Sequence, residues 1–136
     1  MNATGQGIAI RRLQHVSLPF PGTTESLAQA RHFYGEVLGL DERPVPPALP
    51  GTILWFAVGD QEVHLFSEPA GVAVNARSRR HPCLQVDDVA RLRAHLDAAG
   101  VTTRNHDGEI PGRPRFFALD PFGNTIEFVT FEPNHW

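Results

Sequence analysis

The sequence predicts an α+β fold in which two βαβββ modules form a curved mixed sheet that encloses a cleft. The same order of patterns, a strand, a helix and then further strands, occurs twice along the 136 residues. Each half has one stretch with apolar residues at helical spacing, which ends at Gly39 or Gly100. A module of about 50–60 residues cannot bury a sheet face alone. We therefore expect the halves to pack together as a single domain over residues 1–136.

The first module covers about residues 10–67. It begins with a strand at 10–18, which Pro19 is expected to end. A helix follows, because Thr23 offers a capping hydroxyl and apolar residues recur at helical spacing up to Gly39. The elements expected after it are a proline-rich loop, a strand at 53–58 and a returning strand at 62–66.

The second module covers about residues 80–132 and repeats this order. A strand is expected at 81–86, and Asp87 or Asp88 is expected to cap a helix that ends at Gly100. The remaining expected elements are a short strand at 101–104, a polar loop at 105–114, and two closing strands at 115–119 and 125–131.

The composition excludes several kinds of chemistry and partner. The formal net charge is −3, and no long run of one sign occurs, which argues against a general nucleic-acid binder. The chain has no lysine, so Schiff-base chemistry is excluded. Cys83 is the only cysteine, which rules out an internal disulfide and suits the cytoplasm. Neither a signal-peptide pattern nor an apolar run of membrane-spanning length is present.

Four residues that commonly bind metals occupy equivalent positions in the two modules. His15 and His81 lie on the first strand of each module, 66 residues apart, and His64 and Glu127 lie on the last strands, 63 residues apart. A pseudo-twofold arrangement would bring three imidazoles and one carboxylate together around one cation. In the alternative interpretation, each histidine is satisfied separately and Glu127 faces solvent.

The motifs resemble the vicinal oxygen chelate (VOC) superfamily of glyoxalase-like, bleomycin resistance-like and dioxygenase-like proteins. The matching segments are LQHVSL at 13–18, ARHFYGEVLGL at 30–40, VHLF at 63–66, HPCLQVDDVARLRAHLDAAGV at 81–101 and RFFALDPFGNTIEF at 115–128. The resemblance implies a glyoxalase-like fold, and it places His15, His81 and Glu127 at metal-ligand positions of the family. His64 stands where relatives carry glutamate or glutamine.

The resemblance further implies a metal-dependent lyase or isomerase of the glyoxalase I kind. It would act on a small substrate with neighbouring oxygens, including a thiol adduct, through an enediolate-type intermediate. The ion would be one divalent metal, Zn, Ni, Fe, Co or Mn, bound by His15, His64, His81 and Glu127. Glu127 would also move the proton. A homodimer is expected, with the site inside one chain or across two.

Three alternatives remain at this point. A fosfomycin-type thiol transferase would use His15, His81 and Glu127, and needs cations such as Arg115 around a phosphonate. An antibiotic-binding resistance protein would need no metal, and would offer stacking surfaces such as Trp55 and Phe117. An extradiol dioxygenase is less favoured, because a fourth protein ligand would take a position that oxygen or catechol needs.

Overall fold

The structure is a computed structural model of the chain, and it describes residues 7–68 and 78–134. In the first module a four-stranded sheet has the order β1-β4-β3-β2, with β1 parallel to β4. Its elements are β1 (His15–Phe20), α1 (Thr24–Ala30), the π-helical η2 (Arg31–Val37), β2 (Glu42–Arg43), β3 (Ile53–Val58) and β4 (Gln61–Ser67).

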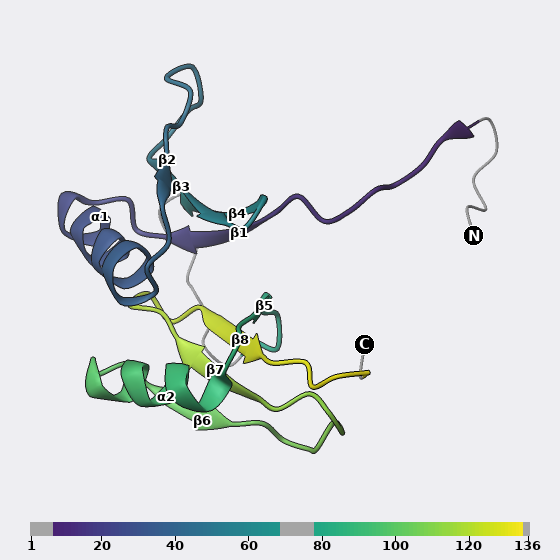
Figure 1. Ribbon diagram of the computed structural model, residues 1–136. Coiled ribbons are helices and arrows are strands. Elements are labelled where there is room, and N and C mark those ends of the chain that lie inside the picture. The colour runs from purple at the N-terminus through teal and green to yellow at the C-terminus, as the bar shows by residue number, and fades with distance from the viewer. Residues whose placement is uncertain (1–6, 69–77, 135–136) are drawn as a thin grey trace.

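The second module repeats this topology. Its sheet has the order β5-β8-β7-β6, with β5 parallel to β8. Its elements are β5 (Cys83–Gln85), α2 (Val89–Ala98), β6 (Thr103–Asn105), β7 (Arg115–Leu119) and β8 (Thr125–Val129). The α+β fold of two βαβββ modules is therefore confirmed. Figure 1 shows both helices on one side of their sheets, which leaves the opposite sheet faces open.

Both helices begin and end where the sequence signals lie. The Thr23 side chain accepts a hydrogen bond from the Ser26 amide at 3.1 Å, and Asp88, rather than Asp87, accepts one from the Arg91 amide at 3.1 Å. Gly39 and Gly100 follow the helices with φ of +72° and +79°, a left-handed conformation that glycine adopts without steric cost.

Strand β1 differs from the prediction at both ends. It begins at His15 rather than at residue 10, because its pairing with β4 starts at the register pair His15 and Glu62, next to the β3–β4 turn. It also continues through Pro19 to Phe20, so the expected end at Pro19 is wrong. A proline is tolerated there because β1 is an edge strand.

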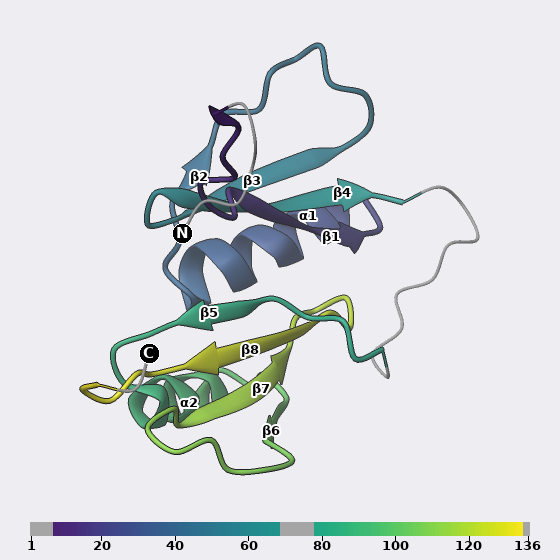
Figure 2. The ribbon, with the colours of Figure 1, turned by 90° about the vertical axis from the view of Figure 1, so that its right-hand side faces the viewer.

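The apolar core is shared by the two modules. The largest fully buried side chains come from both halves of the chain and form one cluster, which includes Phe20, Tyr34, Phe56, Leu96, Ile126 and Phe128. Figure 2 shows the sheet of the first module, with β1, β3 and β4, above the sheet of the second, with β5, β7 and β8. Each module therefore covers apolar surface that the other would otherwise expose to water.

A buried polar contact ties the modules together. The Tyr34 hydroxyl donates to Asp120 Oδ2 at 2.6 Å, and the Asn124 side-chain amide donates to Asp120 Oδ2 at 2.8 Å and to the Pro19 carbonyl at 2.9 Å. Asp120 Oδ1 accepts the amides of Phe122 and Asn124. The DPFGN turn is thus organised around one carboxylate that also binds the first module.

The residues before β1 leave the body of the molecule. In Figure 1 the chain from residue 8 to residue 14 runs away from both modules, and residues 7–14 are all exposed. Within the described ranges, no helix is both long enough and apolar enough to cross a lipid bilayer.

Candidate functional site

The candidate site residues lie on the sheet faces that point away from the helices. Side chains alternate along a strand, so Trp55 and His64, which are register partners, share one face of the first sheet. On the second sheet, Glu127 is the register partner of both Phe117 and Cys83. Each module therefore presents a small cluster of polar and aromatic groups on its open face.

In the first module, three rings form a stack. The His64 ring lies 4.0 Å from the His15 ring with an angle of 17° between them, and 4.6 Å from the Trp55 ring with an angle of 14°. His64 is only 5% exposed as a result. The indole Nε1 of Trp55 is buried without a hydrogen-bond partner among the described residues.

This stack limits what the two histidines do together. The lone pair of an imidazole nitrogen lies in the plane of its ring, and a metal sits about 2.0–2.1 Å from that nitrogen. Because the rings of His15 and His64 are nearly parallel and stacked, their lone pairs do not converge on one point. Joint coordination by both requires one ring to turn.

Glu62 completes the cluster on the first module. Its Oε1 lies 2.9 Å from His64 Nε2, and the hydrogen bond from His64 lowers the pKa of the Glu62 carboxyl below its ordinary value. His15 Nδ1 lies 2.7 Å from the side-chain oxygen of Gln14. These contacts leave Nε2 of His15 and Nδ1 of His64 as the nitrogens available to a ligand.

In the second module, His81 and Glu127 form a direct pair. His81 Nε2 lies 2.8 Å from Glu127 Oε1. Its other nitrogen, Nδ1, lies 2.8 Å from the Arg79 carbonyl, which can only accept, so Nδ1 carries a proton. Nε2 and the carboxylate oxygen therefore face each other across a position that a proton or another cation must fill.

Two further side chains contact the Glu127 carboxylate. Arg115 Nε lies 3.5 Å from Glu127 Oε2, so this arginine, expected at the substrate, pairs with the candidate base. Cys83 packs on the other side, and burial together with the Glu127 charge raises the pKa of its thiol to about 12. Glu127 is 14% exposed and is therefore a largely buried, fully partnered carboxylate.

Phe117, another expected substrate contact, forms a T-shaped pair with His81, with ring centroids 5.2 Å apart. The Arg104 guanidinium lies over the Phe117 ring, 4.2 Å from the ring centroid. The Phe117 ring therefore makes a cation–π contact with Arg104 and an edge contact with His81.

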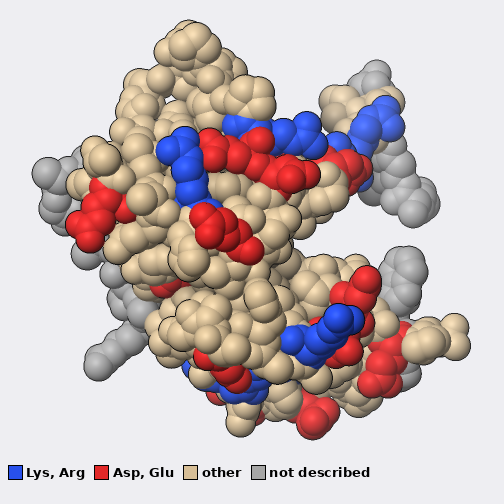
Figure 3. Space-filling model, turned by 60° about the vertical axis from the view of Figure 1, so that its left-hand side comes forward, with Lys and Arg blue, Asp and Glu red and all other residues tan. Residues whose placement is uncertain are grey.

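A cavity of about 330 Å³ lies where the two modules meet. His15 and Glu62 line it from the first module, and His81 and Cys83 line it from the second. In Figure 3 the surface is notched between the half that carries residues 7–14 and the other half. Across residues 7–68 and 78–134, however, no three His, Cys, Asp or Glu side chains gather closely enough to hold a metal ion. The four expected ligands stand as two pairs.

Sequence reasoning missed three of these groups. Glu62 is two residues before His64, and the period of a β-strand places both on one face, so the contact between them could have been predicted from the sequence. The Cys83 contact depends on the parallel register of β5 and β8, and the Arg79 carbonyl depends on the path of the chain before β5. Neither carries a pattern in the sequence.

Residues 12–128 match the sequence profile of the Glyoxalase/Bleomycin resistance protein/Dioxygenase superfamily. The chain belongs to this superfamily, as its motifs indicated. Among proteins with curated functions, none matches it.

Several solved structures share the fold. One described as a glyoxalase family protein, from Bacillus anthracis, is 31% identical with a TM-score of 0.80, over 92% of this chain and 98% of that one. The lactoylglutathione lyase of Agrobacterium tumefaciens is 23% identical with a TM-score of 0.64, over 88% and 92%. A fosfomycin resistance protein of Listeria monocytogenes is 15% identical with a TM-score of 0.74, over 93% and 96%. The last two likenesses establish the fold alone.

Proposed function

We propose that this protein is a metal-dependent lyase or isomerase of the glyoxalase I kind, acting on a small substrate with neighbouring oxygens. One divalent transition ion would be held by His81 and Glu127 of the second module together with His15 and His64 of the first. The observation that carries the proposal is the His81 pair: Nδ1 is anchored on the Arg79 carbonyl, and Nε2 faces the buried Glu127 carboxylate.

The donor set fits such an ion in its chemistry. Imidazole and carboxylate suit zinc, nickel, iron(II), cobalt and manganese. A metal-binding histidine usually donates its second N–H to a carboxylate or a backbone carbonyl, which fixes the tautomer, and His81 does this with Arg79. A cation between His81 and Glu127 would replace the proton that their contact otherwise needs. Bound there, the ion would polarise a substrate carbonyl oxygen.

The chain's own groups would then handle the proton and the orientation of the substrate. Glu127 would take a proton from the carbon next to the carbonyl and return it to the neighbouring carbon. Arg115, 3.5 Å from Glu127, would hold the carboxylate in place. Phe117 and Trp55 would offer apolar surface to the rest of the substrate, and the partial burial of Glu127 would exclude competing water.

The separation of the ligands into two pairs favours a site completed by a homodimer. In such a dimer the first-module pair of one copy would meet the second-module pair of another, and each of two symmetric sites would contain both. This arrangement would also cover the open sheet faces. The cytoplasmic location expected from the single cysteine belongs to the same proposal.

Metal binding by purified protein tests the proposal directly. We expect one Zn²⁺ per chain by calorimetric titration, and His81→Ala should weaken binding by at least about 100-fold, because loss of a mere orienting partner already costs 10–100-fold. His32→Ala is the matched control, since His32 is an exposed imidazole that pairs with Glu36 on the surface of the helix. The Zn²⁺ affinity of His64→Ala shows how many side chains bind the ion: an unchanged affinity indicates three protein ligands, and a weaker affinity indicates four. Equal binding by the His81 variant and the control would refute the metal site.

Activity assays then address the reaction. Conversion of methylglyoxal with glutathione or another thiol, lost in Glu127→Gln, would support the glyoxalase assignment. Solvent deuterium entering a carbon next to the carbonyl, without net turnover, would assign epimerisation instead. A protein that binds Zn²⁺ but does neither would be no isomerase of this kind.

A further inference from the structure

Four side chains of the first module form one continuous chain of hydrogen bonds. His64 Nε2 lies 2.9 Å from Glu62 Oε1, and the side-chain amide of Gln14 donates to the same oxygen at 3.4 Å. The side-chain oxygen of Gln14 in turn lies 2.7 Å from His15 Nδ1. Glu62 is therefore connected, directly or through Gln14, to both histidines that the first module offers to a metal ion.

Strand geometry brings these groups to one face of the sheet. Glu62 and His64 are two residues apart on β4, so their side chains point the same way. His15 is the register partner of Glu62 in the parallel pair of β1 and β4, which places it on that face too. The Glu62 amide also donates to the Gln14 carbonyl at 3.1 Å, so the backbone fixes the spacing of the cluster.

The Glu62 carboxylate determines which nitrogen of His64 carries a proton. A glutamate is ionised at neutral pH, and a carboxylate can only accept hydrogen bonds. His64 must therefore donate from Nε2. In the neutral imidazole this leaves the lone pair on Nδ1, and a metal binds a histidine through the nitrogen that has the lone pair.

Gln14 passes the same constraint to His15. Its NH₂ group faces Glu62, because exchanging the two ends of the amide would set two acceptor oxygens against each other. Its oxygen therefore faces His15 and accepts from Nδ1. The lone pair of His15 is then on Nε2.

We propose that Glu62 is a positioning residue of the metal site, and that the first module binds the ion through His64 Nδ1 and His15 Nε2. The inference rests on the proposed function, since it takes these histidines as ligands of a divalent ion. In the second module the Arg79 carbonyl holds the proton of His81 on Nδ1, so His81 binds through Nε2. His64 thus differs from the other two histidines in the nitrogen that it presents.

Glu62 also affects how His64 binds. A neutral imidazole brings no negative charge to the ion, whereas a carboxylate bonded to its second nitrogen makes it a stronger ligand. His64 is buried and the Glu62 side chain is 22% exposed, so water screens their contact only partly. His15 and Gln14 are exposed, so the turn of one ring that joint coordination requires falls to His15, while Glu62 keeps His64 in place.

Nitrogen NMR of the histidine rings tests the tautomers in the metal-free protein. A free imidazole is neutral at about pH 8, and there a nitrogen with a proton and one without give well-separated resonances. We expect the proton on Nε2 of His64 and on Nδ1 of His15 and His81. In Glu62→Ala, His15 and His64 should each show an average of both tautomers, while His81, held by the Arg79 carbonyl, should not change.

Zn²⁺ titration then measures what the positioning contributes to binding. Glu62→Ala should weaken Zn²⁺ binding by about 10–100-fold, the usual effect of losing a residue that orients a ligand. Glu62→Gln keeps an oxygen that accepts from His64, and should recover most of that loss. In the wild type, Zn²⁺ should shift the Nδ1 resonance of His64 rather than its Nε2 resonance.

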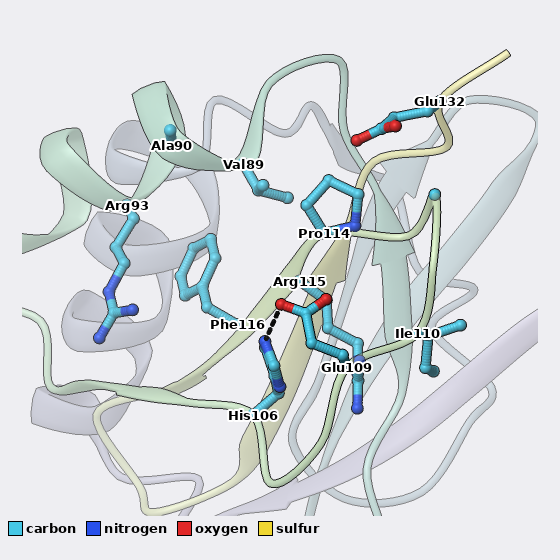
Figure 4. Close-up of a pocket in the computed structure, with 11 residues that line it drawn as sticks. Val89, Ala90, Arg93, His106, Glu109, Ile110, Pro114, Arg115, Phe116 and Glu132 are labelled. Carbon is cyan, nitrogen blue, oxygen red and sulfur yellow. Dashed lines mark ion pairs between the residues drawn. The ribbon is translucent and has the colours of Figure 1, made fainter.

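A second histidine–glutamate pair provides the control. Figure 4 shows His106 and Glu109 facing each other, with Nε2 and Oε1 4.0 Å apart. They lie in a pocket of about 410 Å³ whose described lining includes none of the four expected ligands. Glu109 is 85% exposed, so the pair is weak. Glu109→Ala should leave the Zn²⁺ affinity and the tautomers of His15 and His64 unchanged.

The outcomes separate this inference from the proposed function. Unchanged tautomers or an unchanged Zn²⁺ affinity in Glu62→Ala would overturn the positioning role and leave the metal site standing. A shift on Nε2 of His64 would overturn the assignment of its ligating nitrogen. If Glu62→Gln binds as weakly as Glu62→Ala, Glu62 acts through its charge or as a ligand, and the positioning role is wrong. A wild-type chain that binds no Zn²⁺ overturns the proposed function itself, and this inference with it.

Discussion

Replacing Tyr34 with phenylalanine removes one oxygen atom from the contact between the modules. Tyr34 is fully buried, and its hydroxyl is 2.6 Å from Asp120 Oδ2, which is itself only 5% exposed. The phenyl ring keeps its stacking on Phe56, 5.5 Å away, so packing is preserved and the hydrogen bond alone is lost. The variant therefore measures what this bond contributes to the union of the two halves.

The magnitude follows from the bond that is lost and the bonds that remain. A hydrogen bond to a charged group contributes about 1.5–3 kcal/mol. Asp120 Oδ2 keeps the Asn124 side-chain amide at 2.8 Å, so its oxygen is not left unsatisfied. We expect a loss near the lower end, about 1.5–2 kcal/mol, which corresponds to a melting temperature lower by about 5–10 °C in a domain of this size.

The loss should also depend on pH. Burial raises the pKa of Asp120 from 3.8, while the bonds from Tyr34 and Asn124 oppose this rise. A raised carboxyl pKa stabilises the fold below pH 3.8, and this contribution disappears as the pH rises through the folded-state pKa. Without Tyr34 that pKa is higher still. The difference in unfolding free energy between wild type and variant should therefore increase as the pH rises through this range.

Urea denaturation at a series of pH values, followed by circular dichroism, measures both quantities. A variant as stable as wild type at neutral pH would show that the Tyr34 contact contributes nothing. A loss of unfolding free energy that is equal at every pH would show that the Tyr34 hydrogen bond does not act through the ionised form of Asp120.

Two further predictions concern single contacts. Gly22 has φ +76°, and an added Cβ would lie 2.5 Å from Ser67 Cβ. Gly22→Ala should therefore lower the unfolding free energy by about 2–4 kcal/mol. The control is Gly108→Ala, where the space is open, and it should change the unfolding free energy by less than about 0.5 kcal/mol in the same denaturation assay. With its thiol pKa raised to about 12 by burial and by Glu127, Cys83 should react slowly with iodoacetamide at neutral pH, and Glu127→Gln should speed the reaction. Equal rates would contradict the contribution of the Glu127 charge.

Much of the fold was predictable because local signals agreed with the tertiary structure. The strand predicted at 115–119 is β7 without change, and the capping signals at Thr23 and Asp88 mark the helix starts. The strand β2 was hidden in a proline-rich stretch, since two residues make no periodic pattern. The π-helical turns of η2 also leave no mark, because their residues have the spacing of an ordinary helix.

The sequence allowed the strand positions of the four candidate metal ligands to be predicted, but not how the ligands of the two modules come together. The repeat made His15 equivalent to His81 and His64 equivalent to Glu127, with one member of each pair in each module. In the structure the close contacts lie within the modules: the rings of His15 and His64 stack, and His81 lies 2.8 Å from Glu127. The meeting of all four stays a prediction, because it depends on how two modules or two copies are docked. Docking is decided by shape and packing across the whole surface, which periodicity within a strand does not encode.

Pro19 affects how another chain can approach the first sheet. It faces the outer edge of β1, where it has no N–H to donate, and its carbonyl is already occupied by Asn124. Within the described residues, His15 and Ser17 at the beginning of that edge are the positions whose amides can pair with an added strand. The far end is chemically closed, which discourages the indefinite strand-by-strand growth that leads to fibrils and confines any added strand to the neighbourhood of His15.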